Sequence, residues 1–160
     1  MKYLGTLIAV TDMEKSKQFY RDLFGLNAVA DFGANVTLEG GVFLQTLDTW
    51  GNFIHGMPVT LGGHAGELYF EERDMDGFLA KLNTFDISYV HPPIEHPWGQ
   101  RVVRFYDPDR HVVEVGEDMT MVVKRFLDSG MTVEETARRM DVPQSYVRNC
   151  LEPQTRGEKE

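Results

Sequence analysis

The chain begins with a two-residue alternation of hydrophobic and polar positions and then changes to a helical period. Residues 2–12 (KYLGTLIAVTD) alternate, which predicts a strand. Residues 13–26 (MEKSKQFYRDLFGL) place apolar residues at helical spacing and reach Gly25, which predicts an amphipathic helix closed by a glycine. Residues 35–47 predict two strands joined by a Gly-Gly turn. The first part of the chain is therefore expected to contain strand, helix and hairpin.

The same order of patterns returns between residues 66 and 117. A strand is predicted over 66–74, a helix over 75–85, and three further strands at 87–92, 100–106 and 111–117. Asp12 and Asp74 stand at matching strand-to-helix junctions, 62 residues apart, and each is expected to cap its helix. This duplication of a β-α-β-β-β unit is an internal repeat, and it predicts an α+β fold of two similar modules.

The repeat singles out two pairs of equivalent positions. Seven residues before the aspartate of each junction lie Gly5 in the first half and Glu67 in the second. Four residues after the last turn of each half lie Gln45 and Glu114. Three of these four side chains carry oxygen atoms within otherwise apolar strands, so they are candidates for chemistry.

A charge also interrupts each strand of the final hairpin, RVVRFYDPDRHVVEVGE. A buried charge without a partner costs several kcal/mol, so Arg104 and Glu114 are expected to face a partner or a ligand. A three-residue loop over 108–110 would pair Asp107 with His111 and put Arg104 opposite Glu114 on one face. A two-residue loop would shift the register by one and separate the two charges.

Charge and composition limit the classes of partner. The net charge of −9 falls entirely on residues 1–118, because residues 119–160 hold seven Lys/Arg and seven Asp/Glu. An acidic surface repels nucleic acid and anionic lipid. No apolar run approaches the ~20 residues that span a bilayer, and the N-terminus lacks the pattern of a signal peptide. The single cysteine, Cys150, fits a reducing compartment, so we expect a cytoplasmic protein.

Residues 119–152 form a separate helical extension in this interpretation. One helix is predicted over 119–127, a second from Thr132 with a capping box completed by Glu135, and a third from about Pro143.

The last two of these helices resemble the helix-turn-helix of bacterial regulators. DNA binding is nevertheless not expected, because the third helix offers only Arg148 as a base and the extension is neutral beside an acidic body. A role in interaction or in dimer support is the preferred interpretation. Residues 153–160 are expected to be disordered.

Three segments resemble the vicinal oxygen chelate superfamily, which includes glyoxalase I, extradiol dioxygenases and the bleomycin and fosfomycin resistance proteins. They are LGTLIAVTDMEKSKQFYRDLFGL, ELYFEERDMDGFLAKL and WGQRVVRFYDPDRHVVEV. The resemblance covers residues 1–118 and implies two β-α-β-β-β modules, 1–56 and 65–118. In this family the modules form one cupped mixed sheet, and members commonly assemble as homodimers. The family turn also favours the three-residue loop.

The resemblance further implies a divalent metal held on four positions, of which this chain keeps three. Gln45, Glu67 and Glu114 match ligand positions, whereas Gly5 has no donor. Oxygen ligands suit Mg²⁺ or Mn²⁺ better than Zn²⁺, and Ni²⁺ is a further candidate. Two interpretations stay open: Arg104 replaces the metal between Glu67 and Glu114, or the carboxylates hold a metal and Arg104 anchors an anionic substrate.

Other side chains are candidates for substrate binding. The segment 90–101 (VHPPIEHPWGQR) is expected to be a loop at the mouth of the cup, so it could bring a ring or an amide to a ligand. The full set of substrate-binding candidates is Arg104, Tyr69, Trp50, Trp98, His96 and Gln100. His55, His64 and His111 show no ligand spacing and are expected at the surface.

Three functional hypotheses follow. The first is a glyoxalase-like lyase or isomerase that acts on a small oxygen-rich or anionic metabolite, with Glu67 and Glu114 as catalytic carboxylates. The second is a metal-free binding protein, similar to the antibiotic-sequestering members, in which Trp50, Tyr69 and Trp98 hold a flat ligand. The third is a ligand-sensing regulator that works through the C-terminal extension.

Overall fold

The computed structural model describes residues 1–152, and the predicted disordered tail 153–160 lies outside the described residues. The chain divides into two compact units. The first contains Met1–Leu68, Ala80–Val90 and Phe105–Val113. The second contains Tyr69–Leu79, His91–Arg104 and the described chain from Glu114 onward. The proposed boundaries at 56, 65 and 118 stay predictions.

The first sheet has the strand order β1-β4-β3-β2. Its strands are β1 (Thr6–Val10), β2 (Ala28–Asp31), β3 (Asn35–Leu38) and β4 (Val42–Thr46). Strand β1 pairs parallel with β4, and the other pairs are antiparallel. A single 3₁₀ turn, η1 (Glu39–Gly41), joins β3 to β4. The sheet belongs to the first module of the repeat.

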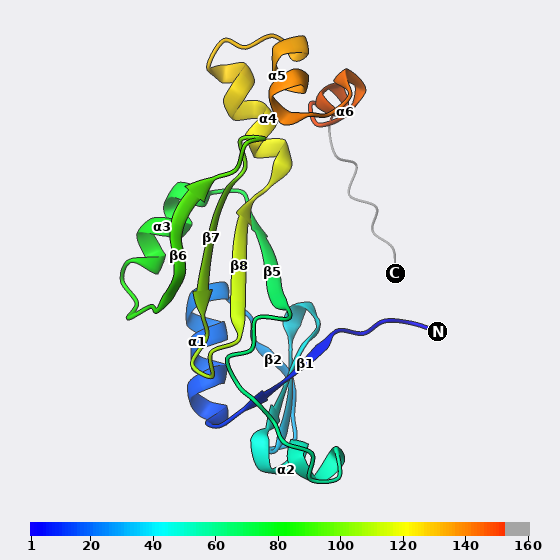
Figure 1. The fold of residues 1–160 in the computed structure, drawn as a ribbon, viewed down its shortest axis with the longest axis vertical. Helices are drawn as coiled ribbons and strands as arrows, with labels where there is room; N and C mark the ends of the chain where they lie inside the picture. The colour runs from blue at the N-terminus through cyan, green and yellow to red at the C-terminus, as the bar shows by residue number, and fades with distance from the viewer. Residues whose placement is uncertain (153–160) are drawn as a thin grey trace. The chain divides into compact units, whose positions relative to one another are not determined.

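The second sheet repeats this order as β5-β8-β7-β6, and its strands lie side by side in Figure 1. Its strands are β5 (Glu67–Glu72), β6 (Tyr89–Glu95), β7 (Arg101–Tyr106) and β8 (Val112–Glu117). Helix α3 (Met75–Leu82) follows β5 as α1 (Met13–Phe24) follows β1. The α+β fold and the internal repeat predicted from the sequence are confirmed.

Helix α1 forms where its sequence signals place it. Asp12 accepts a hydrogen bond from the Lys15 amide at 3.0 Å, and Gly25 takes the left-handed conformation with φ 72°. Both caps satisfy backbone groups that the helix leaves unpaired. Tyr20 and Leu23 are buried in the core of the first unit. The helix therefore anchors the first sheet through one apolar face.

The turn between β7 and β8 is the three-residue loop that the family pattern favours. Asp107 N donates to His111 O at 3.0 Å, and Arg110 takes the left-handed conformation with φ 68°. Gly41, at the equivalent place before β4, has φ 84°. A left-handed residue at both places supports the equivalence of β4 and β8, although arginine adopts this conformation less readily than glycine.

Two elements differ from the sequence prediction. Strand β6 continues to Glu95, so the expected loop over 90–101 is reduced to residues 96–100. Helix α2 (Leu47–Phe53) follows β4, where no helix was predicted. Its seven residues include a glycine and a β-branched threonine, so no local signal identifies it.

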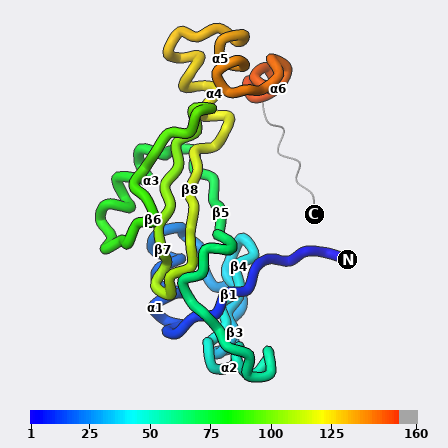
Figure 2. The backbone as a smooth tube through the Cα atoms, viewed as in Figure 1, coloured from blue at the N-terminus to red at the C-terminus, as the bar shows by residue number. Residues whose placement is uncertain are grey.

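The C-terminal extension consists of α4 (Met119–Asp128), α5 (Val133–Met140) and α6 (Gln144–Asn149), which gather into one cluster (Figure 2). The predicted capping box is present, because Thr132 and Glu135 bond each other's backbone amides. The three helices share a core of Val122, Val123, Phe126, Ala137, Met140 and Val147. Among the described residues, every helix is too short or too polar to cross a membrane.

Candidate functional site

Arg104 and Glu114 form an ion pair inside the second unit, which answers the question of what these two charges face. Strand β7 carries the arginine and β8 the glutamate, and the three-residue turn puts them on the same face, as predicted. The Glu114 side chain is 6% exposed and that of Arg104 is 26% exposed. A buried carboxylate is tolerated because the guanidinium balances its charge.

His91 at β6 adds to this pair from the neighbouring strand. Its Nδ1 lies 2.8 Å from the backbone oxygen of Pro92, which fixes the proton on Nδ1. Its Nε2 lies 3.3 Å from an Nη of Arg104. His91 therefore contacts the same guanidinium that pairs with Glu114.

The loop after β6 places two rings beside these charges. His96 and Trp98 stack with ring centroids 4.3 Å apart and an interplanar angle of 21°. Burial, followed by the charges of Arg104 and His91, lowers the pKa of His96 below its ordinary 6.5. The imidazole is therefore neutral near pH 7 and can accept a proton or a hydrogen bond. Trp98 is 38% exposed and offers an open aromatic face.

Gln100 ties this loop to β5 and β8. Its Nε2 donates to the Tyr69 hydroxyl at 3.2 Å and to the Glu117 backbone oxygen at 3.0 Å, and its Oε1 accepts from Trp98 Nε1 at 3.2 Å. Burial raises the pKa of Tyr69, so its phenol stays protonated and can donate to Glu71 at 3.1 Å. A Cβ on Gly116 would press on Gln100 and Tyr69.

The predicted binding residues of the second unit thus share one surface. Arg104, Glu114, His96, Trp98, Gln100 and Tyr69 are joined by the contacts described above. We call this set the β7–β8 face. Sequence reasoning missed His91, whose only signal was its place in the ring-rich segment before Trp98.

Gln45 lies in the first unit and is held by neutral hydrogen bonds. Its Oε1 accepts from Asn35 at 2.8 Å, and its Nε2 donates to Thr49 at 2.5 Å. The side chain is almost fully buried. Trp50 follows on α2 and is half-buried. The amide oxygen of Gln45 is therefore already used inside its own module.

Gly5 does not pair with Gln45 across the first sheet. The strand partner of Gln45 is Ala9, four residues further along β1. Gly5 instead packs on Gly41, and a Cβ at Gly5 would overlap the Gly41 carbonyl oxygen. The first family ligand position is therefore a close backbone contact that only glycine permits.

Glu67 lines a pocket of about 230 Å³ in the first unit. Thr6 and Ile8 of β1, Val112 and His111 also contribute to its wall. Glu67 is exposed, and exposed and half-buried residues alternate along β5. The expectation that Gln45, Glu67 and Glu114 meet at one point stays a prediction.

The donor set does not fit the divalent ion that members of the superfamily commonly use. Gly5 has no room for a side chain, the Gln45 amide is bonded at both ends, and a guanidinium already balances Glu114. Hard cations need several oxygens directed at one point. Among residues 1–152, no group of three or more His, Cys, Asp and Glu side chains is arranged to hold a metal ion.

A buried polar network around the β7–β8 turn was not predicted. Asp107 accepts from the Tyr20 hydroxyl at 2.8 Å and from His111 Nδ1 at 2.9 Å. Burial acts to lower the pKa of His111, but the hydrogen bond to Asp107 together with the charges of Asp107 and Asp109 outweighs it, and the pKa is raised. The expectation that His111 is a surface residue is wrong, because Asp107 draws the ring inward. The exposed His55 and His64 agree with it.

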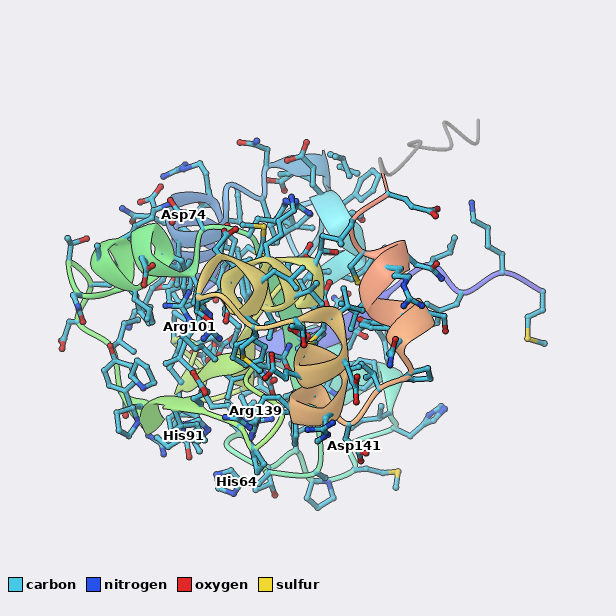
Figure 3. All side chains as sticks on the ribbon, turned by 90° about the horizontal axis from the view of Figure 1, so that it is seen from above. His64, Asp74, His91, Arg101, Arg139 and Asp141 are labelled. Atoms are coloured by element: carbon cyan, nitrogen blue, oxygen red, sulfur yellow. The ribbon has the colours of Figure 1, made fainter. Side chains whose placement is uncertain are left out.

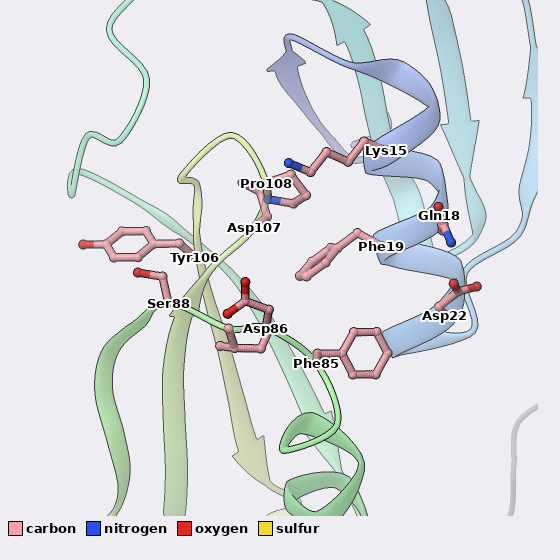
Figure 4. Close-up of a pocket in the computed structure, with 11 residues that line it drawn as sticks. Lys15, Gln18, Phe19, Asp22, Phe85, Asp86, Ser88, Tyr106, Asp107 and Pro108 are labelled. Atoms are coloured by element: carbon pink, nitrogen blue, oxygen red, sulfur yellow. The ribbon is translucent and has the colours of Figure 1, made fainter.

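A second pocket of about 310 Å³ opens in the first unit, and Figure 4 shows its wall. Phe19 of α1, Phe85 and Pro108 give it apolar sides, and Lys15 and Asp86 stand at its rim. These residues come from segments that are far apart in the sequence. Therefore no local pattern could have indicated the pocket.

Comparison with known proteins places this geometry in a family. Residues 3–120 match the family described as the Glyoxalase-like domain, so the chain belongs to that family. It is thereby a member of the vicinal oxygen chelate superfamily, as the sequence motifs predicted. The matched range ends just inside α4, so most of the C-terminal extension lies outside it.

Three relatives illustrate the range of similarity. A protein of unknown function from Agrobacterium tumefaciens is 36% identical with a TM-score of 0.67, covering 74% of this chain and 94% of its own. A lactoylglutathione lyase from Agrobacterium tumefaciens is 26% identical with a TM-score of 0.59, covering 72% and 92%. The uncharacterised protein YraH of Bacillus subtilis is 27% identical, covering 72% and 97%.

Proposed function

We propose that this protein binds a small flat organic acid on the β7–β8 face without a divalent metal. The observation that carries the proposal is the Arg104–Glu114 ion pair, in which a guanidinium balances the carboxylate at the family's fourth ligand position. The fork of an arginine matches a carboxylate in geometry and charge. A ligand carboxylate would share Arg104 with Glu114.

The surroundings of the pair favour a ligand with one negative charge and a ring. Trp98 and Tyr69 offer aromatic surface on which a ring can lie. Glu114 and Glu71 are both acidic, so a ligand with several negative charges would be repelled. The neutral imidazole of His96 provides an acceptor for a hydroxyl or amide on the ligand.

Titration with benzoate, and with benzyl alcohol as a neutral match, tests this proposal by ligand-observed NMR or calorimetry. Benzoate is expected to bind more tightly than the alcohol, and Arg104→Met should weaken it about tenfold or more, because a charge-assisted hydrogen bond is lost. Arg73→Met is the matched control, since Arg73 is exposed and pairs with Asp118.

Equal binding of the two probes, or benzoate binding unchanged in Arg104→Met, would contradict the proposal. The same titrations repeated with Mg²⁺, Mn²⁺, Ni²⁺ and Zn²⁺ test the metal-bound alternative. A metal that binds stoichiometrically and is required for benzoate binding would replace the metal-free interpretation.

A second candidate function is a lyase or isomerase, and the lowered pKa of His96 favours it. A neutral imidazole beside a ligand can accept a proton at neutral pH. One neighbour is a lactoylglutathione lyase, so turnover of lactoylglutathione is the assay, with His96→Phe as the variant that should abolish it.

Homodimerisation and a cytoplasmic location remain parts of the proposal. Light scattering on the 18.3 kDa chain would give twice that mass for a dimer. Binding of DNA is not part of it, because α6 offers only one arginine.

A further inference from the structure

The C-terminal extension contacts the loop that carries His96, Trp98 and Gln100, which gives these added helices a role beside the family fold. Helix α4 supplies both contacts. Arg125 donates to the backbone oxygen of Gly99 at 2.5 Å. The ring of Phe126 fills the space beside Gly99, where a Cβ would overlap it. The loop is therefore held at Gly99, next to Trp98 and Gln100, by a hydrogen bond and by a packing contact.

Arg125 also pairs with the buried carboxylate of Glu117. The same residue contacts the other end of the loop through its backbone oxygen. Glu117 accepts from Arg125 at 3.0 and 3.2 Å and from Arg101 at 2.9 and 3.1 Å. Burial acts to raise the pKa of Glu117, but these hydrogen bonds outweigh it and hold the pKa below its ordinary 4.5. The backbone oxygen of Glu117 accepts from Gln100.

The start of the loop is held by the extension as well. Glu95, the last residue of β6, pairs with Arg125 at 3.4 Å and with Arg139 of α5 at 3.2 Å. Figure 3 labels Arg101 and Arg139, the arginines that flank Arg125 in this network. Glu95 at the end of β6, and Gly99 and Gln100 within the loop, are therefore held by the extension, either directly or through Glu117.

We infer that Arg125 is a positioning residue for the ligand loop, and that the C-terminal extension orders Trp98 and Gln100 for binding. The inference rests on the proposed function of the β7–β8 face. An ordered loop spares the ligand the entropic cost of fixing it. Without Arg125 the loop opens more often, and the ligand binds more weakly although it never touches the arginine.

The loop can be observed without any ligand, because it has its own internal hydrogen bonds. His96 N donates to Gln100 O, and Gly99 N donates to His96 O, each at 2.8 Å. Amide exchange at His96 and Gly99 therefore reports opening of the loop. In a Trp50→Phe background Trp98 is the single tryptophan, so acrylamide quenching reports its exposure.

The test compares Arg125→Met and Arg125→Lys with Arg138→Met in the full chain. Arg138 is an exposed arginine of the same extension that pairs only with Glu134 in the described contacts. In Arg125→Met we expect faster exchange at His96 and Gly99, about twofold stronger quenching of Trp98, and benzoate affinity reduced about fivefold. Arg125→Lys keeps the charge beside Glu117 and should recover part of each effect, while Arg138→Met should change none.

The outcomes separate the inference from the proposed function. If wild-type protein binds no benzoate, the proposed function fails, whereas the exchange and quenching data still test the positioning of the loop. If benzoate binds but Arg125→Met leaves exchange, quenching and affinity unchanged, the inference is overturned. Should Arg125→Met fail to fold, the same three readouts in Arg125→Lys decide the matter.

Discussion

Strands β4 and β8 occupy the same place in the two sheets, yet they stabilise their buried polar residues by different chemistry. Gln45 on β4 is held by neutral hydrogen bonds from Asn35 and to Thr49. Glu114 on β8 is held by the charge of Arg104. The two sheets therefore share the position of a buried polar residue, but they stabilise that residue by different interactions.

The difference extends to the first strand of each module. Gly5 before β1 is pressed against Gly41 and cannot carry a side chain. Glu67 at the start of β5 is exposed and lines a pocket. Of the four equivalent positions, only the two in the second module, Glu67 and Glu114, therefore carry ionisable side chains.

The largest effect is expected from Gly5→His, which adds a donor at the position where Gly5 has none. The new side chain would collide with the Gly41 backbone, and φ of 152° suits glycine. We expect a loss of about 3 kcal/mol or more in the free energy of unfolding, measured in urea.

Gly63→His is the matched control, because nothing lies within 4 Å of a Cβ at Gly63. If Gly5→His unfolds at the same urea concentration as this control and binds Ni²⁺, the close approach to Gly41 does not explain the missing ligand.

Arg104→Met should have the next largest effect, because it leaves Glu114 buried without its guanidinium. The expected loss of stability is about 3 kcal/mol, the lower end of the range for breaking a buried pair, since Arg104 is partly exposed. Urea denaturation at pH 7 measures it, and the double variant with Glu114→Gln should recover part of the loss. Arg138→Met, which breaks an exposed ion pair with Glu134, should cost under about 0.5 kcal/mol. An equal loss in both variants would mean that the Arg104–Glu114 pair contributes no more than an exposed pair.

Gln45→Leu should cost less than Arg104→Met, because neutral hydrogen bonds are lost instead of a charge pair. We expect a loss of about 1–2 kcal/mol, since Asn35 and Thr49 each lose a partner. The same urea assay measures it against the exposed Gln18→Leu. A loss larger than that of Arg104→Met would reverse the comparison.

The smallest effect is a pH dependence in the β7–β8 turn. The pKa of His111 is raised in the folded state, so its bond to Asp107 stabilises fully below pH 6.5 and is lost as pH rises through the folded pKa. Wild type should therefore lose stability relative to His111→Gln above pH 6.5, measured by urea midpoints between pH 6 and 9. The urea midpoint of His55→Asn should change with pH as that of wild type does. If the urea midpoint of His111→Gln also has the same pH dependence as wild type, the linkage is disproved.

The Arg104–Glu114 pair shows what sequence reasoning could reach. The Asp107–Arg110 turn fixed the strand register, and the register put both charges on one face. His91, which contacts Arg104, could not be found in this way, because it lies on a different strand, β6. The close contact between Gly5 and Gly41 could not be found in this way either, because it depends on how two segments approach one another.

The amino-acid sequence by itself determined the repeated modules, the capped helices and the face that each charge occupies, because these follow from periodicity and turn chemistry within short segments. Only the tertiary structure decided that Gly5 contacts backbone, that Gln45 is satisfied in its own module, and that Arg125 reaches Gly99. Such contacts depend on how closely segments distant in the chain approach one another. No local pattern of residues encodes that distance.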